Sequence, residues 1–164
     1  MSRPRPESTP PEVGTVAPDF TLRNQNNSDV TLSAFQGKAP ALLIFYPFAF
    51  SRICTGELRE LRGGLATYTA AGVEVVAIST DPTYALKAYA EAEGYRFTLL
   101  SDFWPHGAVA QAYGVFNDKA GMAVRGTFLV DIAGTVAFAE VNGPGQARDQ
   151  SAWRRAAEAA NQTA

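Results

Sequence analysis

The sequence contains almost none of the residues on which several protein classes depend. Its 164 residues include one cysteine and one histidine. A single cysteine cannot form an intrachain disulfide, which excludes the disulfide framework typical of small secreted proteins. A metal site built from several cysteines is excluded for the same reason.

An excess of one charge and a long apolar run are also missing. The net charge of −2 gives no electrostatic reason to bind nucleic acid or an anionic membrane surface. The longest apolar stretch, residues 39–50, is too short to span a bilayer and contains two prolines. Residues 1–12 are rich in proline and charge, without the apolar core of a signal peptide. We therefore expect a cytoplasmic protein with a disordered tail at residues 1–12.

Residues 13–164 have the length of one domain. The run 41–46 is apolar at every position, which predicts a strand buried on both faces. Helical spacing of apolar residues follows from about Cys54 to Gly72, and residues 73–78 form the next predicted strand. A strand, helix and strand of this length predict a βαβ unit with parallel strands.

The remaining pattern predicts a mixed sheet covered by helices on both faces, within one α/β domain. Asp81 and Ser33 are placed as helix N-caps, and Ala133-Gly134 as a two-residue hairpin turn. The other predicted elements are edge strands at 20–22 and 30–32, a short helix ending at Gly37, a helix from Pro82 to Gly94, a strand at 97–100, a helix at 106–113, strands at 127–132 and 135–140, and a closing helix around Trp153.

Cys54 lies where the buried strand leads into a helix. The first turn of a helix has unpaired backbone N–H groups and the positive end of the helix dipole, which favours a thiolate over a thiol. The alternative is an inert core cysteine, the common fate of a lone cysteine. The position at a helix start favours the reactive interpretation.

The residues before Cys54 resemble a known motif. Pro47-x-x-x-Ser51-x-x-Cys54 resembles the motif of the peroxiredoxin family, and Arg125 stands where the family places an arginine ahead of a strand. The order of elements is similar to the thioredoxin fold. Together with the single cysteine, residues 101–107 most resemble the one-cysteine AhpE-type subgroup. Residues 17–22, 100–103 and 112–115 also resemble family motifs.

This resemblance implies a thiol-dependent peroxidase that reduces hydrogen peroxide and organic hydroperoxides without a cofactor or metal. The thiolate of Cys54 would attack one peroxide oxygen and become a sulfenic acid. Since the chain has no second cysteine, an external thiol must reduce that sulfenic acid. The resemblance implies a low-molecular-weight thiol or a thioredoxin- or mycoredoxin-type protein as this reductant.

The resemblance also assigns roles around the sulfur. The Ser51 hydroxyl can donate to the thiolate and accept from the peroxide, it can cap the helix, or it can do both. Arg125 would stabilise the thiolate and the developing oxyanion, the alternative being a solvated arginine. Pro47 would shield the sulfur from water or merely end the strand. The backbone N–H groups of Ile53 and Cys54 are the expected oxyanion donors.

Other residues near the motif have less specific roles. Glu57 either orients an arginine such as Arg125 or favours the helix dipole as an acidic residue near the helix start. We expect Arg52 to be solvated and His106 to have a structural or interface role. Residues 103–105, Phe-Trp-Pro, resemble the family's dimer-contact region, which implies a homodimer or a larger oligomer.

Two other functions remain open from the sequence. Glu57 occupies the fourth position, where C-x-x-C enzymes have their second cysteine, and Thr127 falls where thioredoxins place a cis-proline. Both argue against a dithiol oxidoreductase, although a monothiol glutaredoxin-like enzyme remains an alternative. A peroxide sensor or holdase with Cys54 as its switch is the other, and would be oxidised once instead of turning over.

Overall fold

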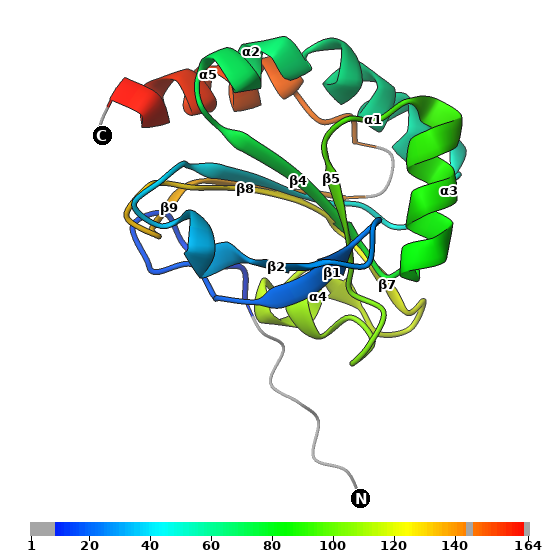
Figure 1. The fold of residues 1–164 in the computed structure, drawn as a ribbon. Coiled ribbons are helices and arrows are strands. Elements are labelled where there is room, and N and C mark those ends of the chain that lie inside the picture. Colours follow the sequence, from blue (N-terminus) through cyan, green and yellow to red (C-terminus); the bar gives the residue numbers. More distant parts are fainter. Residues whose placement is uncertain (1–8, 144–145, 163–164) are drawn as a thin grey trace, which may run out of the picture.

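The computed structural model describes residues 9–143 and 146–162 (Figure 1). The predicted tail, residues 1–12, lies mostly outside this range, and residues 9–12 have no regular secondary structure. Within the described ranges, no helix combines the length and the apolar composition needed to cross a bilayer.

A mixed sheet of seven strands runs through the centre of the molecule (Figure 1). The strand order is β2-β1-β5-β4-β3-β8-β9, with β3, β4 and β5 parallel and the other neighbours antiparallel. A short pair, β6 and β7, was not predicted. The strands are β1 Thr21–Asn24, β2 Asp29–Thr31, β3 Ala41–Phe45, β4 Glu74–Ser79, β5 Thr98–Ser101, β6 Phe116–Asn117, β7 Met122–Ala123, β8 Arg125–Val130 and β9 Val136–Asn142.

Helices cover both faces of the sheet, as predicted. Four of them, α1, α2, α3 and α5, pack on one face, whereas α4 packs on the other (Figure 1). The helices are the 3₁₀ helix η1 Leu32–Phe35, α1 Arg52–Gly63, α2 Leu65–Ala70, α3 Thr83–Glu93, α4 Ala108–Ala112 and α5 Gln150–Gln162.

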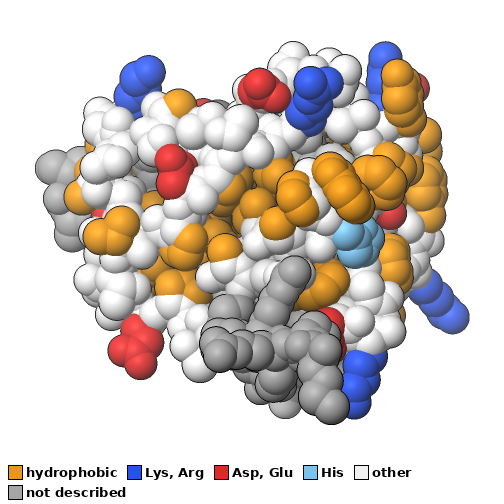
Figure 2. All heavy atoms as spheres, turned by 90° about the horizontal axis from the view of Figure 1, so that it is seen from below, with side chains coloured by type: hydrophobic (Ala, Val, Ile, Leu, Met, Phe, Trp, Pro, Cys, Tyr) orange, Lys and Arg blue, Asp and Glu red, His pale blue; other side chains and the backbone are white. Residues whose placement is uncertain are grey.

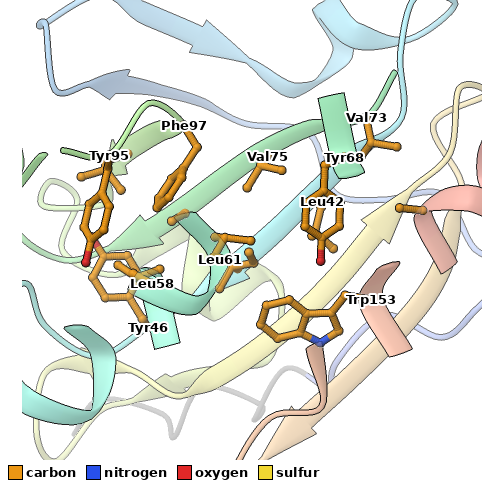
Figure 3. Close-up of a cluster of buried hydrophobic side chains, with 14 of the residues drawn as sticks. Leu42, Tyr46, Leu58, Leu61, Tyr68, Val73, Val75, Tyr95, Phe97 and Trp153 are labelled. Atoms are coloured by element: carbon orange, nitrogen blue, oxygen red, sulfur yellow. The ribbon is translucent and has the colours of Figure 1, made fainter. Parts of the chain in front are cut away.

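Strand β3 lies between β4 and β8 and is buried on both sides. Leu42 and Ile44 join the apolar cluster under α1, α2, α3 and α5, while Leu43 and Phe45 join the cluster on the opposite face. This alternation is the two-residue period of a strand. Figure 3 shows the first cluster, with Leu58, Leu61 and Trp153 among its side chains. The core therefore fixes the end of β3, where the loop that leads to Cys54 begins.

The structure corrects a predicted helix and a predicted turn. The helix expected from Cys54 to Gly72 is two helices that meet at Gly64, because two adjacent glycines have low helix propensity. The two-residue turn at Ala133-Gly134 is longer, since β8 ends at Val130 and β9 begins at Val136. Asp131 Oδ1 accepts the backbone N–H groups of Ala133 and Thr135, which widens the turn.

Both helix N-caps predicted outside the motif were also wrong. Residue Thr31 is the N-cap of η1, and the N–H of Ser33 donates to Asp19 Oδ1. Pro82 is the N-cap of α3, without a side-chain cap. The carboxylate of Asp81 instead accepts a backbone N–H from the loop between β3 and α1.

Candidate active site

The loop between β3 and α1 places Cys54 in the first turn of α1. Ser51 is the helix N-cap, and its Oγ lies 3.4 Å from the backbone N of Cys54, which donates to it. The first helical hydrogen bond runs from the N of Thr55 to the carbonyl of Ser51. The N–H of Ile53 precedes this bond and therefore has no helical acceptor.

The sulfur of Cys54 is enclosed by the protein. The residue is only 2% exposed and belongs to the apolar cluster that contains Leu58 and Leu61. Its neighbours Phe50 and Ile53 are each 57% exposed. The thiol therefore lies just beneath the surface, near exposed apolar side chains of the loop between β3 and α1 and of the first turn of α1.

One turn along α1 from Cys54, Glu57 meets two arginines from distant parts of the chain. Its Oε1 lies 3.4 Å from Nε of Arg125, the first residue of β8. Its Oε2 lies 2.8 Å from Nε of Arg148, which precedes α5. Glu57 is the sixth residue of α1 and lies outside the first turn. Of its two expected roles, the contact with an arginine therefore fits its position better than an interaction with the helix dipole does.

Arg148 was not predicted, and it is the most deeply buried member of this cluster. Its side chain is 1% exposed. The guanidinium donates to the carbonyl of Phe45 at 2.7 Å and to Thr127 Oγ1 at 3.3 Å. It also lies 5.8 Å from the ring centroid of Trp153. Arg148 thereby links the end of β3, strand β8 and helix α1.

The charges of the cluster do not cancel. Burial lowers the pKa of Arg148 below its ordinary value, while the nearby carboxylate of Glu57 acts in the opposite direction. Arg125 is almost as buried, at 9% exposed, and donates to the carbonyl of Gln146 at 3.0 Å. Two guanidinium groups facing one carboxylate leave one net positive charge at this end of α1.

The structure also places the other residues that were considered from the sequence. Pro47 is half-buried, two residues after the end of β3. Arg52 is exposed. The His106 ring is exposed, and its Nε2 lies 2.7 Å from the carbonyl oxygen of Gly121, so the ring supports a loop. No feature of spacing marks Arg148 in the sequence, because only the fold brings residue 148 beside Glu57.

The fold and this site define a class of protein. A buried β3 that leads into a helix with a lone thiol in its first turn is typical of thiol-dependent oxidoreductases of the thioredoxin-like fold. Residues 13–139 match the model of the AhpC/TSA family. The chain therefore belongs to this family, the peroxiredoxins.

Its relatives agree with this assignment. Alkyl hydroperoxide reductase E of Mycobacterium tuberculosis (strain ATCC 25618 / H37Rv) is 52% identical over 141 residues, 86% of this chain and 92% of the relative. Peroxiredoxin Bcp of Escherichia coli (strain K12) is 37% identical over 133 residues, 77% of this chain and 83% of the relative. Together with the single cysteine, these similarities confirm the prediction of a one-cysteine peroxiredoxin, a thiol-dependent peroxidase.

Solved structures confirm the predicted thioredoxin-like fold. AhpC of Enterococcus faecalis superposes with a TM-score of 0.83 at 27% identity, covering 92% of this chain and 93% of that chain. The reduced 2-Cys peroxiredoxin of Plasmodium vivax gives a TM-score of 0.81 at 30% identity, covering 92% and 97%.

Proposed function

We propose that Cys54 reduces hydrogen peroxide and organic hydroperoxides. The thiolate attacks one oxygen, the O–O bond breaks, and the leaving hydroxide or alkoxide takes up a proton from solvent to become water or an alcohol. The sulfur is oxidised by two electrons to a sulfenic acid while the peroxide is reduced. The observation that carries this proposal is the position of a buried thiol in the first turn of α1, one turn from the cluster of Glu57, Arg125 and Arg148.

The surrounding groups have distinct roles in this proposal. The net positive charge of the arginine cluster stabilises the anion on sulfur and the charge that develops on the leaving oxygen. The Ser51 oxygen caps the helix by accepting a hydrogen bond, and the hydroxyl group can still donate a hydrogen bond to the sulfur or the peroxide. The N–H of Ile53 is a further oxyanion donor, and Pro47 contributes no competing N–H.

Glu57 and Arg148 act through other groups. The carboxylate holds both guanidinium groups toward α1, and Arg148 ties this arrangement to Phe45 at the end of β3. Both are therefore positioning residues, whose removal would displace Arg125 and the start of α1.

An external thiol regenerates the enzyme. With one cysteine in the sequence, the sulfenic acid of Cys54 has no partner thiol in its own chain. A low-molecular-weight thiol or a thioredoxin- or mycoredoxin-type protein forms a mixed disulfide with Cys54 and then releases it. This dependence on reducing thiols supports action in the cytoplasm, where such thiols are kept reduced.

The exposed aromatic face formed by the start of α3 and the connection between β5 and α4 supports a homodimer. Tyr84 is 85% exposed, Trp104 81% and Phe103 50%. Figure 2 shows hydrophobic side chains beside the single histidine, His106, and the ring centroids of Phe103 and His106 are 6.2 Å apart. A patch of this kind is typical of an interface, and a second copy of the chain is its proposed occupant.

Rapid mixing of the reduced protein with hydrogen peroxide, and separately with an organic hydroperoxide, tests the peroxidase assignment. We expect Cys54 to be oxidised orders of magnitude faster than free cysteine, and turnover to require an added thiol. The Cys54→Ser variant is the control and should consume no peroxide. Oxidation of Cys54 at the rate of free cysteine would contradict the proposal, and a single oxidation without turnover by any thiol would favour a sensor.

A further inference from the structure

Asp81 reaches from the end of β4 into the loop that carries the active-site motif. Its Oδ2 accepts the backbone N–H of Ala49 at 2.8 Å and the hydroxyl of Ser79 at 2.6 Å. Hydrogen bonds to a carboxylate are stronger than those between neutral groups. The middle of the loop between β3 and α1 is therefore held by a charged acceptor from a neighbouring strand.

Asp81 is itself fixed by the sheet. Ser79, the last residue of β4, is completely buried. At the end of β5, Ser101 donates its hydroxyl proton to the carbonyl oxygen of Asp81 at 2.6 Å. Hydroxyl groups at the ends of two parallel strands thus hold the carboxylate and the backbone of Asp81 in place.

The residue after Ala49 shows why this hold matters. Phe50 has a φ of 66°, a left-handed conformation that a bulky side chain adopts only when its surroundings impose it. Its ring packs on Tyr89 of α3 with centroids 4.8 Å apart, and the Tyr89 hydroxyl lies 2.9 Å from Thr55 Oγ1. Asp81 and Tyr89 thus hold the two residues that immediately precede the cap of α1.

We infer that Asp81 is a positioning residue for the chemistry of Cys54. Its carboxylate fixes Ala49, and with Tyr89 it sets the backbone that presents Ser51 and the first turn of α1. This inference rests on the proposed peroxidase function. It requires an acceptor oxygen at position 81, because the contact with Ala49 is a hydrogen bond from a backbone N–H.

Two substitutions distinguish the effect of the hydrogen bond to Ala49 from the effect of the negative charge on Asp81. Asp81→Ala removes the acceptor and should slow oxidation of Cys54 by hydrogen peroxide, by up to about 100-fold, the effect of a small misplacement of reacting groups. Asp81→Asn keeps an oxygen for Ala49 and should restore most of the rate. Alkylation of Cys54 by iodoacetamide should not slow in the alanine variant, because a released loop uncovers the thiol.

Asp19→Ala is the matched control. Asp19 also accepts backbone N–H groups, from Phe20 and Ser33, but it lies outside the active-site loop. We expect it to lower stability without changing the peroxide rate. Equal rates for Asp81→Ala and the wild type would overturn the inference, as would equal slowing by the alanine and asparagine variants.

Hydrogen exchange at the N–H of Ala49 tests this inference independently of the proposed function. Faster exchange in Asp81→Ala than in Asp81→Asn supports the positioning role, even if wild-type Cys54 reacts with peroxide no faster than free cysteine. Equal exchange in the two variants overturns it, even if the wild type is a fast peroxidase.

Discussion

Glu57 faces two guanidinium groups with a single carboxylate. Its side chain is 15% exposed, and those of Arg125 and Arg148 are 11% and 1% exposed. Burying a charge is costly unless it is paired, and removing the carboxylate would leave both guanidinium groups uncompensated. The three side chains should therefore behave as one energetic unit, in which each substitution changes the effect of the next.

The Glu57→Gln and Arg148→Gln variants test this coupling. Glu57→Gln should lower the free energy of unfolding by about 3 kcal/mol, since it leaves two buried guanidinium groups without a carboxylate. Arg148→Gln should lower it by less, since Glu57 keeps its contact with Arg125. The double variant should lose less than the sum, because it removes both charges of the closest pair. Urea denaturation of the two single variants and the double variant measures the difference.

Arg59→Gln is the control for a surface pair. Arg59 Nε lies 2.7 Å from Glu93 Oε2, a shorter contact than either in the buried cluster, but the Arg59 side chain is 55% exposed. Water and salt screen such a pair, so little stability should be lost. Strict additivity of the Glu57 and Arg148 losses would contradict the interpretation of the cluster as a unit.

At the scale of secondary-structure elements, the sequence predicted the features that depend on residues close together in the chain. The apolar run at 41–46 predicted β3, and the turn after it placed Cys54 at a helix start, as the structure shows. Arg148 and the contact of Asp81 with Ala49 were not predictable in this way. Both depend on residues brought together by the sheet, and a buried arginine has the same local signature as a solvated one.

The connection between β5 and α4 contains a buried carboxylate. Asp102 is 1% exposed, and its two oxygens accept the N–H groups of Val109 and Ala110 at 3.1 and 2.9 Å. Burial raises its pKa from 3.8 to about 6, although these two hydrogen bonds act in the opposite direction. Between these pH values the folded protein holds a proton that the unfolded chain has released.

The pH dependence of stability follows from this difference. The contribution of Asp102 should lower the free energy of unfolding by about 3 kcal/mol at most as pH rises from about 4 to about 6. Above about pH 6 this contribution should stay constant. The side chain at position 102 cannot ionise in the Asp102→Asn variant, so the stability of this variant lacks the pH-dependent contribution of Asp102. Urea midpoints of both proteins from pH 4 to pH 7 measure it. Wild-type and variant curves that run parallel across this range would contradict the assignment.

At the scale of the whole molecule, the exposed aromatic face predicts the oligomeric state. The chain has a mass of 17.5 kDa, so sedimentation or light scattering should give twice this mass. Trp104→Glu places a charge in the proposed interface and should shift the protein toward monomer. Val16→Glu, at another site that is 80% exposed, is the control and should leave the mass unchanged. A monomeric wild type would contradict the homodimer.

The distance along the chain between Cys54 and its two arginines has a consequence for biosynthesis. A ribosome makes the N-terminal part first, so the thiol and its helix exist before Arg125 and Arg148 have been added. A nascent chain that stops before residue 125 carries the cysteine without the positive charge that the complete fold supplies. In the proposed mechanism, the stabilisation that Arg125 and Arg148 give to the thiolate of Cys54 is therefore available only after the ribosome has added both residues.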